Sequence, residues 1–139
     1  MDKPVISGDT IVIPSDQEFL ADIDSFVEGT LRGLGADESV IADIAISVSE
    51  LVNNAIVHGN KFARDKSVTV KMAHSNRTLV ISVADQGGGF DPGRVPNPLA
   101  QENLLKEVGR GIFIVRQLME QVDIIPSAHG TTITITKAI

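Results

Sequence analysis

The sequence predicts an α+β fold: a two-layer sandwich in which a mixed, mostly antiparallel sheet carries three helices on one face. Two observations favour it. Segments with the alternation of β-strands follow one another across short turns, which is typical of antiparallel pairing. Segments with helical spacing each show one apolar face, which must be buried against another layer. The predicted order is strand, helix, helix, strand, strand, long loop, helix, strand, strand.

Length and composition indicate one globular domain over residues 1–139, because a chain of this size buries roughly two-thirds of its unfolded surface. Hydrophobic residues make up 42% and charged residues 22%, unlike a disordered chain. The net charge of −6 and the lack of a Lys/Arg-rich run argue against nucleic-acid binding. The chain has no cysteine, no secretory leader pattern and no apolar segment approaching the roughly 20 residues of a membrane span. We therefore expect a soluble cytoplasmic protein.

The first predicted elements are a short strand and a helix. Residues 9–13 alternate as a strand does, and Pro14 ends it. Ser15 with Glu18 three residues later has the spacing of a capping box, which predicts the start of a helix. Gly33-Leu34-Gly35 is a typical helix end. The helix between them has an apolar face made of Phe19, Leu20, Ile23, Phe26, Val27 and Leu31.

A longer amphipathic helix is predicted from about Glu38 to about His58, with Asp37 as its cap and Gly59-Asn60 as its end. Apolar residues recur along it at intervals of three and four, as a buried helix face requires. These residues are Val40, Ile41, Ile44, Ala45, Val48, Leu51, Val52, Ala55 and Ile56.

The opposite face of this helix carries Glu50 and Asn54, one turn apart and within about 40° of each other, with Asn53 and His58 beside them. A carboxylate and a carboxamide in this arrangement can serve as a general base and as an oxygen ligand for a hard cation. Two adjacent asparagines also lower helix propensity, which suggests a use for them. The alternative, a solvated face of a surface helix, remains open at this stage.

The second half of the chain predicts two strand pairs separated by a loop and a helix. Residues 67–72 and 78–84 read as a hairpin with its turn at Ser75-Asn76. Residues 90–108 contain proline and show little periodicity, so we interpret them as a functional lid. A third helix follows, and residues 122–125 and 131–136 form the closing strand pair. The apolar positions of that helix are Ile112, Val115, Leu118 and Met119.

Two glycine clusters adjoin predicted elements. Asp85 ends a buried strand just before Gly87-Gly88-Gly89, where backbone can approach a ligand closely and a carboxylate can accept a hydrogen bond from an amine such as that of adenine. A flexible turn is the alternative. Gly109-Arg110-Gly111 comes directly before the third helix, whose free N–H groups can hold phosphate. Arg110 either adds positive charge there or faces solvent.

Several common sites are excluded by the sequence. Neither the dinucleotide fingerprint nor the Walker A phosphate loop is present. The three histidines, His58, His74 and His129, fall on different elements without a second ligand at metal spacing, so a zinc site is not expected. No nucleophile elbow marks a hydrolytic serine.

Three segments together resemble the motifs of the Bergerat-fold, or GHKL, ATP-binding superfamily. Residues 50–59 look like its N-box, residues 85–89 like its G1 box of form D-x-G-x-G, and residues 109–112 like its G2 box. Within the superfamily, the small size, the E-x-x-x-N-A-x-x-H-G form and the strand beginning at Gly130-Thr131-Thr132 resemble the bacterial anti-sigma factor serine/threonine kinases.

The resemblance implies a role for each matched residue. Glu50 corresponds to the general base that activates an attacking hydroxyl, and Asn54 to the ligand of Mg²⁺. Asp85 corresponds to the carboxylate that binds adenine. The other matched residues correspond to the adenine pocket, the lid hinge and the phosphate-binding end of the lid: Gly87, Gly89, Gly109, Arg110, Gly111, Ile112 and Thr131.

The same resemblance implies a function and partners. Such a protein binds Mg-ATP, sequesters a sigma factor and phosphorylates a STAS-type anti-sigma-factor antagonist. It also implies a homodimer, for which the first helix and residues 33–35 are candidate surfaces. Two alternatives remain: an ATP-binding regulatory module that only sequesters a partner, and the detached ATPase domain of a split histidine kinase.

Overall fold

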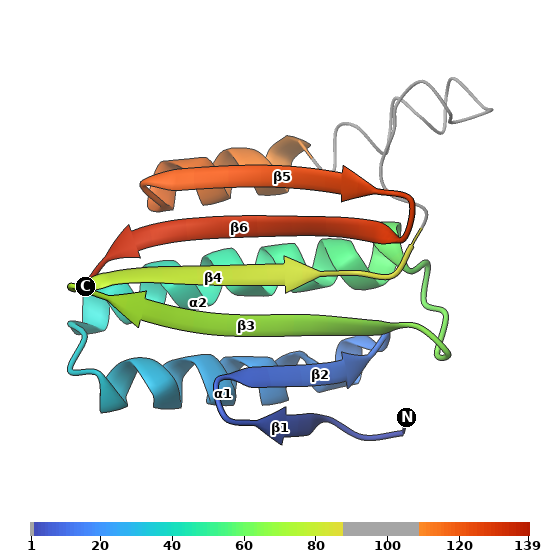
Figure 1. Cartoon of the computed structure of the whole chain (residues 1–139), viewed down its shortest axis with the longest axis horizontal. Coiled ribbons are helices and arrows are strands. Elements are labelled where there is room, and N and C mark those ends of the chain that lie inside the picture. The colour runs from blue at the N-terminus through green and yellow to red at the C-terminus, as the bar shows by residue number, and fades with distance from the viewer. Residues whose placement is uncertain (1, 88–108) are drawn as a thin grey trace.

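A computed structural model describes residues 2–87 and 109–139, and its sheet is covered on one face by helices (Figure 1). The six strands are arranged in the order β1-β2-β3-β4-β6-β5. Every neighbouring pair among them is antiparallel. The predicted α+β two-layer sandwich is confirmed, with antiparallel rather than mixed pairing in the described sheet.

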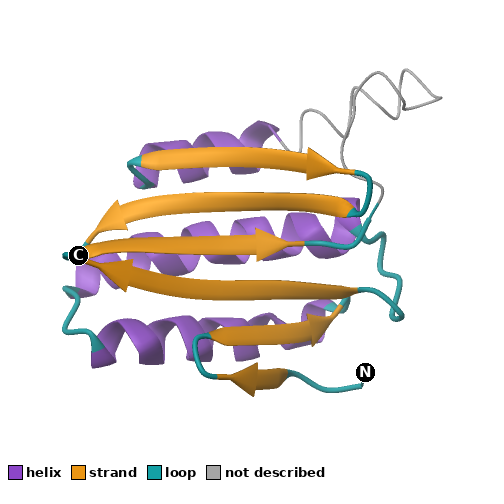
Figure 2. Ribbon diagram, in the orientation of Figure 1, coloured by secondary structure: helices purple, strands orange, loops and turns teal. Residues whose placement is uncertain are grey.

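The strands are β1 (Val5–Ser7), β2 (Thr10–Pro14), β3 (Ser67–Ser75), β4 (Thr78–Ala84), β5 (Gln121–Ser127) and β6 (Gly130–Ala138). The helical elements are η1 (Gln17–Phe19), α1 (Leu20–Gly33), α2 (Glu38–Asn54) and η2 (Ala55–Gly59), followed by a helix over residues 109–118, here called the third helix. Figure 2 shows these helices gathered in one layer behind the strands. The predicted elements are confirmed, and the three-residue strand β1 is an addition that was too short to predict.

The start of α1 differs from the prediction. Asp16, not Ser15, accepts the capping hydrogen bond from the Glu18 N–H, at 2.9 Å, and the first turn is the 3₁₀ helix η1. Ser15 is buried, and its hydroxyl donates to the carbonyl of Lys66 at 2.7 Å. The capping-box prediction was wrong because a tertiary contact uses the Ser15 side chain. At the other end, Gly35 adopts φ +76°, as the predicted helix end requires.

The end of the long helix also has an unpredicted form. The α-helical part ends at Asn54, and η2 continues as a π-helix in which the Asn60 N–H donates to the Ala55 carbonyl at 2.7 Å. Lys61 and Phe62 then take positive φ angles of 52° and 60°. Single π turns of this kind recur at functional sites. The predicted extent to about residue 58 is correct, but the spacing of its last turn is not α-helical.

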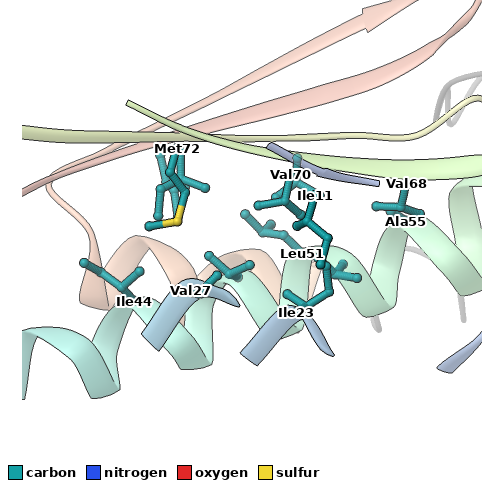
Figure 3. Packing of buried hydrophobic residues seen from close by; sticks show 14 of the residues in the cluster. Ile11, Ile23, Val27, Ile44, Leu51, Ala55, Val68, Val70 and Met72 are labelled. Atoms are coloured by element: carbon teal, nitrogen blue, oxygen red, sulfur yellow. The ribbon is translucent and has the colours of Figure 1, made fainter. Parts of the chain in front are cut away.

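The hydrophobic core lies between the sheet and the helices. Figure 3 shows Val70 and Met72 of β3 directed toward the helix layer, where Val27 of α1 and Ile44 and Leu51 of α2 meet them. The alternation of buried and exposed residues in β3 and β4 places one strand face on this core. This packing holds α2 beneath the centre of the sheet.

Residues Glu38–Gly59 form a helix of 22 residues that contains an 18-residue window with a mean hydropathy of 1.6, long and apolar enough to cross a membrane by those measures alone. The sequence expectation that no segment approaches this length was therefore wrong for α2 and η2. The apolar face is nevertheless packed beneath the sheet: Ile41, Ile44, Val48, Leu51, Val52 and Ile56 are at most 2% exposed. The apolar face of this helix therefore forms part of the hydrophobic core.

Candidate functional site

A pocket of about 90 Å³ lies between α2, η2 and the sheet. Apolar residues from six elements form most of its wall: Leu51, Ala55, Val83, Ile112, Ile124 and Ile133. Four polar side chains, Asn54, His58, Asp85 and Thr131, also face it, together with Gly59. An apolar wall with a few convergent polar groups is typical of a small-molecule site. The pocket therefore joins residues that are far apart in the sequence.

Asp85 directly follows β4, and backbone N–H groups fix its side chain. Its Oδ1 accepts from the Gly87 N–H at 3.0 Å and from the Thr131 N–H at 3.1 Å. The Asp85 N–H in turn donates to the Thr131 carbonyl at 3.0 Å. Within the described residues, the hydrogen bonds to this carboxylate all reach Oδ1. A carboxylate held in this way is oriented before any ligand arrives.

Three glycines allow the backbone to close around Asp85. A Cβ at Gly59 would collide with Asp85 Oδ2, and one at Gly87 would collide with the Gly59 carbonyl oxygen. A Cβ at Gly130, where φ is +142°, would collide with the Asp85 carbonyl oxygen. Gly87 was predicted to shape this pocket, whereas the contacts of Gly59 and Gly130 depend on the tertiary structure. No larger residue fits these positions without a shift of the site.

The third helix packs onto the Glu50 and Asn54 face of α2. A Cβ at Gly111 would lie 3.0 Å from Glu50 Oε2 and 3.1 Å from Asn54 Nδ2. Gly111 therefore permits close approach of the two helices at the predicted base and metal ligand. The structure thus brings together the polar pair that the helix periodicity predicted and one glycine of the third motif.

Two buried polar atoms at the pocket lack a hydrogen-bond partner among the described residues. They are Nδ2 of Asn54 and Oγ1 of Thr131, and both residues line the pocket. An unsatisfied buried donor or hydroxyl costs roughly 1–3 kcal/mol, so native structures rarely leave one without a reason. A polar ligand in this pocket would satisfy both atoms.

The remaining predicted residues are placed as follows. Gly109 and Arg110 are exposed and already helical, so the expectation that they precede the third helix was wrong. Their assignment as phosphate contacts stays a prediction. Gly89 and the predicted lid over 90–108 lie outside the described residues. Asn53, beside the polar pair, accepts a hydrogen bond from the Gln17 amide at 2.7 Å and thus serves packing.

Apart from Ile112, sequence reasoning did not identify the apolar residues that form the wall of the pocket. Val83 and Ile133 occupy paired positions on β4 and β6, and Ile124 pairs with Ile133 from β5. Their alternation along each strand marked them as inward-facing residues, but not which inward positions border a pocket rather than the closed core. Only the position of the third helix decides that.

The residues present fit Mg-ATP. Among the described residues there is no group of three or more His, Cys, Asp or Glu side chains that could hold a metal ion. Mg²⁺ is usually bound through one or two protein ligands together with substrate phosphates, so a single amide such as Asn54 suits it. The unpartnered Thr131 hydroxyl and the oriented Asp85 carboxylate suit a purine.

Comparison with known proteins points the same way. The model of the histidine kinase-like ATPase domain matches residues 13–137. The serine-protein kinase RsbW of Bacillus licheniformis is 31% identical over 130 residues, covering 89% of this chain and 81% of that protein. RsbW of Bacillus pumilus (strain SAFR-032) is 30% identical over 133 residues, covering 90% and 82%.

Solved structures share the fold. The crystal structure of the RsbU and RsbW domains of a Mycobacterium tuberculosis protein superposes with a TM-score of 0.70 at 25% identity, covering 99% of this chain and 32% of that one. The histidine kinase domain of a blue-light activated kinase from Erythrobacter litoralis gives a TM-score of 0.55 at 19% identity, which shows the fold alone. The chain thus belongs to the histidine kinase-like ATPase domain family and, within it, to the group of the serine-protein kinase RsbW, as its three motifs indicated.

Proposed function

We propose that this protein is a cytoplasmic anti-sigma factor serine/threonine kinase that binds Mg-ATP, sequesters a sigma factor and phosphorylates a STAS-type antagonist. One observation carries the nucleotide site: a single pocket is bordered by an oriented carboxylate, Asp85, and by the unpartnered buried atoms of Asn54 and Thr131. The relatives named serine-protein kinase support the transfer to serine.

We assign the base of the nucleotide to the Asp85 end of the pocket. The Asp85 carboxylate accepts a hydrogen bond from the exocyclic amine of adenine, and the Thr131 hydroxyl supplies a second polar contact. Ile112, Ile124 and Ile133 flank the base with apolar surface. The face of α2 that carries Glu50 and Asn54 then receives the phosphates.

Phosphoryl transfer mainly requires positioning and charge neutralisation. Mg²⁺, held by Asn54 and the phosphate oxygens, would neutralise phosphate charge. Glu50 accepts the proton of the attacking serine hydroxyl, whose oxygen forms the new bond to the γ-phosphorus as the bond to the β-phosphate oxygen breaks. The products are ADP and a phosphoserine.

The phosphoserine explains how the partners would exchange. It adds a charge of about −1.5 to −2 at a protein interface, and this opposes rebinding to an acidic surface. The kinase carries a net charge of −6. We propose that the modified antagonist leaves the kinase and that the kinase, as a homodimer, is then available to hold the sigma factor.

Two substitutions on one helix face test the transfer chemistry. We expect Glu50→Gln to bind Mg-ATP as the wild type does but to label a purified antagonist at least about 100-fold more slowly, because the general base is lost. We expect Asn54→Ala to lose the Mg²⁺-dependent part of ATP binding. The measurements are isothermal titration with and without Mg²⁺ and transfer of labelled phosphate.

Asn53→Ala is the matched control, because Asn53 is the neighbouring asparagine and contacts Gln17 instead of the pocket. It should keep both binding and transfer. Wild-type transfer by Glu50→Gln would refute the assignment of the base. A label lost in acid would indicate a phosphohistidine and hence a histidine kinase domain, and tight binding without any transfer would indicate a regulatory module.

A further inference from the structure

Asn60, directly after η2, is almost fully buried at 2% exposure and has no place in the proposed chemistry. Its side chain nevertheless contacts three separate segments. The Nδ2 group donates to the Ser15 hydroxyl at 2.8 Å and to the Ser67 carbonyl at 2.9 Å. The Oδ1 atom accepts from the Gln86 N–H at 2.8 Å. A buried amide with this many partners fixes the relative position of the segments that it joins.

The partners determine how the amide is oriented. The Ser67 carbonyl can only accept a hydrogen bond, and the Gln86 N–H can only donate one. Nδ2 must therefore face Ser67, and Oδ1 must face Gln86. The Ser15 hydroxyl can accept from Nδ2 because its own proton goes to the Lys66 carbonyl at 2.7 Å. Both ends of the amide are thus used, and neither can be exchanged for the other.

The Gln86 contact lies at the pocket. Gln86 stands between Asp85, which we assign to adenine, and Gly87, whose N–H holds the Asp85 carboxylate. On the other side of the contact, Gly59 immediately precedes Asn60 and lies against Asp85 so closely that a Cβ would collide with its carboxylate. The hydrogen bond from Gln86 to Asn60 therefore joins two backbone segments that already lie close together. Figure 1 shows the ends of β4 and α2 at the same edge of the molecule.

A second contact supports the same segment from β3. The Gln86 side-chain oxygen accepts from the Ser67 N–H at 2.7 Å and from the Ser67 hydroxyl at 3.1 Å. Gln86 is exposed, so this contact competes with water and is weaker than one to a buried group. The buried amide of Asn60 is thus the stronger constraint on the loop that begins with Asp85.

We propose that Asn60 is a positioning residue for adenine recognition. Through its contact with Gln86, Asn60 holds the Asp85 carboxylate at the position in the pocket where it meets the exocyclic amine of adenine. The inference rests on the proposed nucleotide site. Guanine presents a carbonyl oxygen where adenine presents an amine, so a correctly placed carboxylate repels guanine and attracts adenine. Loss of the Gln86 contact should therefore reduce the preference for ADP over GDP, and a residue that only stabilised the fold would leave that preference unchanged.

The test compares Asn60→Ala with Ser15→Ala in the full chain. Both substitutions remove hydrogen bonds from the same network, but only the first removes the contact to Gln86. Titration with ADP and with GDP, well below the melting temperature, gives the preference of the folded protein. We expect Asn60→Ala to lose about tenfold in preference for ADP, since it leaves the Gln86 N–H without its partner. Ser15→Ala should melt earlier and keep the wild-type preference.

Asn60→Asp adds a second comparison, because it keeps an oxygen for the Gln86 N–H and replaces Nδ2 by oxygen opposite the Ser67 carbonyl. It should be less stable than the wild type and retain more of the ADP preference than Asn60→Ala. Equal preferences in Asn60→Ala and the wild type would overturn the proposal, and so would equal losses in Asn60→Ala and Ser15→Ala. A wild type that binds no ADP would instead refute the proposed function.

Hydrogen exchange in the wild type provides a test that needs no variant. If Asn60 holds the loop before the ligand arrives, the Gln86 amide of the nucleotide-free protein should exchange as slowly as the hydrogen-bonded amides of β4. This measurement tests whether Asn60 holds the loop even if Asn60→Ala fails to fold. Exchange of Gln86 at the rate of an exposed loop would overturn the proposal.

Discussion

Single residues of the site are explained by space and by hydrogen bonding. A Cβ at Gly59 or Gly130 would collide with Asp85, and one at Gly87 would collide with the Gly59 carbonyl oxygen. Thr131 and Asn54 place buried polar atoms at the pocket without a partner in the described part of the chain. The three glycines allow the backbone to approach Asp85 closely, and the two polar residues are available to contact a ligand. Both features lower the stability of the nucleotide-free protein. These effects can be separated by substitutions with matched controls.

Gly59→Ala tests the need for close approach at Asp85. The new Cβ would displace the carboxylate, so we expect a loss of about 1–3 kcal/mol in unfolding free energy, typical of overpacking, together with weaker ADP binding. Gly29→Ala is the control, since Gly29 is exposed in α1 and a Cβ there meets nothing within 4 Å. That change should stabilise the protein by about 0.5–1 kcal/mol through helix propensity. Wild-type ADP binding by Gly59→Ala would show that the contact is not needed.

Thr131→Val tests the unpartnered hydroxyl. Removing a buried polar group that has no partner should leave the free protein as stable as the wild type or up to about 2 kcal/mol more stable. ADP affinity should fall about fivefold, which corresponds to one hydrogen bond of about 1 kcal/mol. Thr132→Val, on the opposite face of β6, should leave ADP affinity unchanged. Denaturant unfolding and titration measure the two effects, and unaltered affinity in Thr131→Val would exclude the hydroxyl from the site.

At the scale of elements, the third helix is the part that completes the pocket. It supplies Ile112 to the wall and lays Gly111 over the polar face of α2. The helix ends at Leu118, whose carbonyl accepts a hydrogen bond from Lys137 Nζ of β6 at 2.7 Å. Lys137 also lies 3.6 Å from an Asp43 carboxylate oxygen of α2, with its side chain 18% exposed. A lysine at a helix C-terminus satisfies a free carbonyl and complements the helix dipole.

Lys137→Met should therefore loosen the third helix while keeping the aliphatic part of the side chain. We expect a loss of about 1–2 kcal/mol in unfolding free energy, because a charged hydrogen bond and an ion pair disappear together. Hydrogen exchange should accelerate over residues 112–118, and ADP affinity should fall as Ile112 becomes less well placed. The exposed Lys71 of β3 serves as the control in Lys71→Met. Unchanged exchange in Lys137→Met would show that packing alone holds the helix.

At the scale of the whole molecule, the pocket exists because α2 lies beneath the centre of the sheet and the third helix closes one side. No single element contains the site. Asp85 comes from the end of β4, Thr131 from β6, and Asn54 from α2. A ligand that contacts all of them stabilises the native arrangement against unfolding, since the unfolded chain has no such site.

The nucleotide should accordingly raise the melting temperature. ADP with Mg²⁺ at about 100 times its dissociation constant adds roughly 2.7 kcal/mol, which for 139 residues corresponds to a rise of about 9 °C. Asp85→Asn keeps the shape of the side chain but presents an amide to the adenine amine, so it should show little rise. Differential scanning calorimetry checks both. An equal rise in melting temperature in Asp85→Asn and the wild type would show that Asp85 does not recognise adenine.

The sequence alone determined the order of the elements and the residues that share a face. Apolar residues at intervals of three and four marked α2, and alternation marked β3 and β4, because these periods follow directly from helix and strand geometry. The pairing of Glu50 with Asn54 on one face is local in the same sense. Local periodicity also places Asp85 at a strand end, which is why it was recognised as a candidate.

Only the tertiary structure decided which side chains meet. Ser15 and Asn60 are 45 residues apart in the sequence, and no period predicts their hydrogen bond. The same contact explains why Asp16 caps the first helical turn in place of Ser15. The collision of a Cβ at Gly59 with Asp85 likewise depends on how closely α2 packs under the sheet. Packing distances and long-range hydrogen bonds arise from the whole fold, so the chain specifies them only once it has folded.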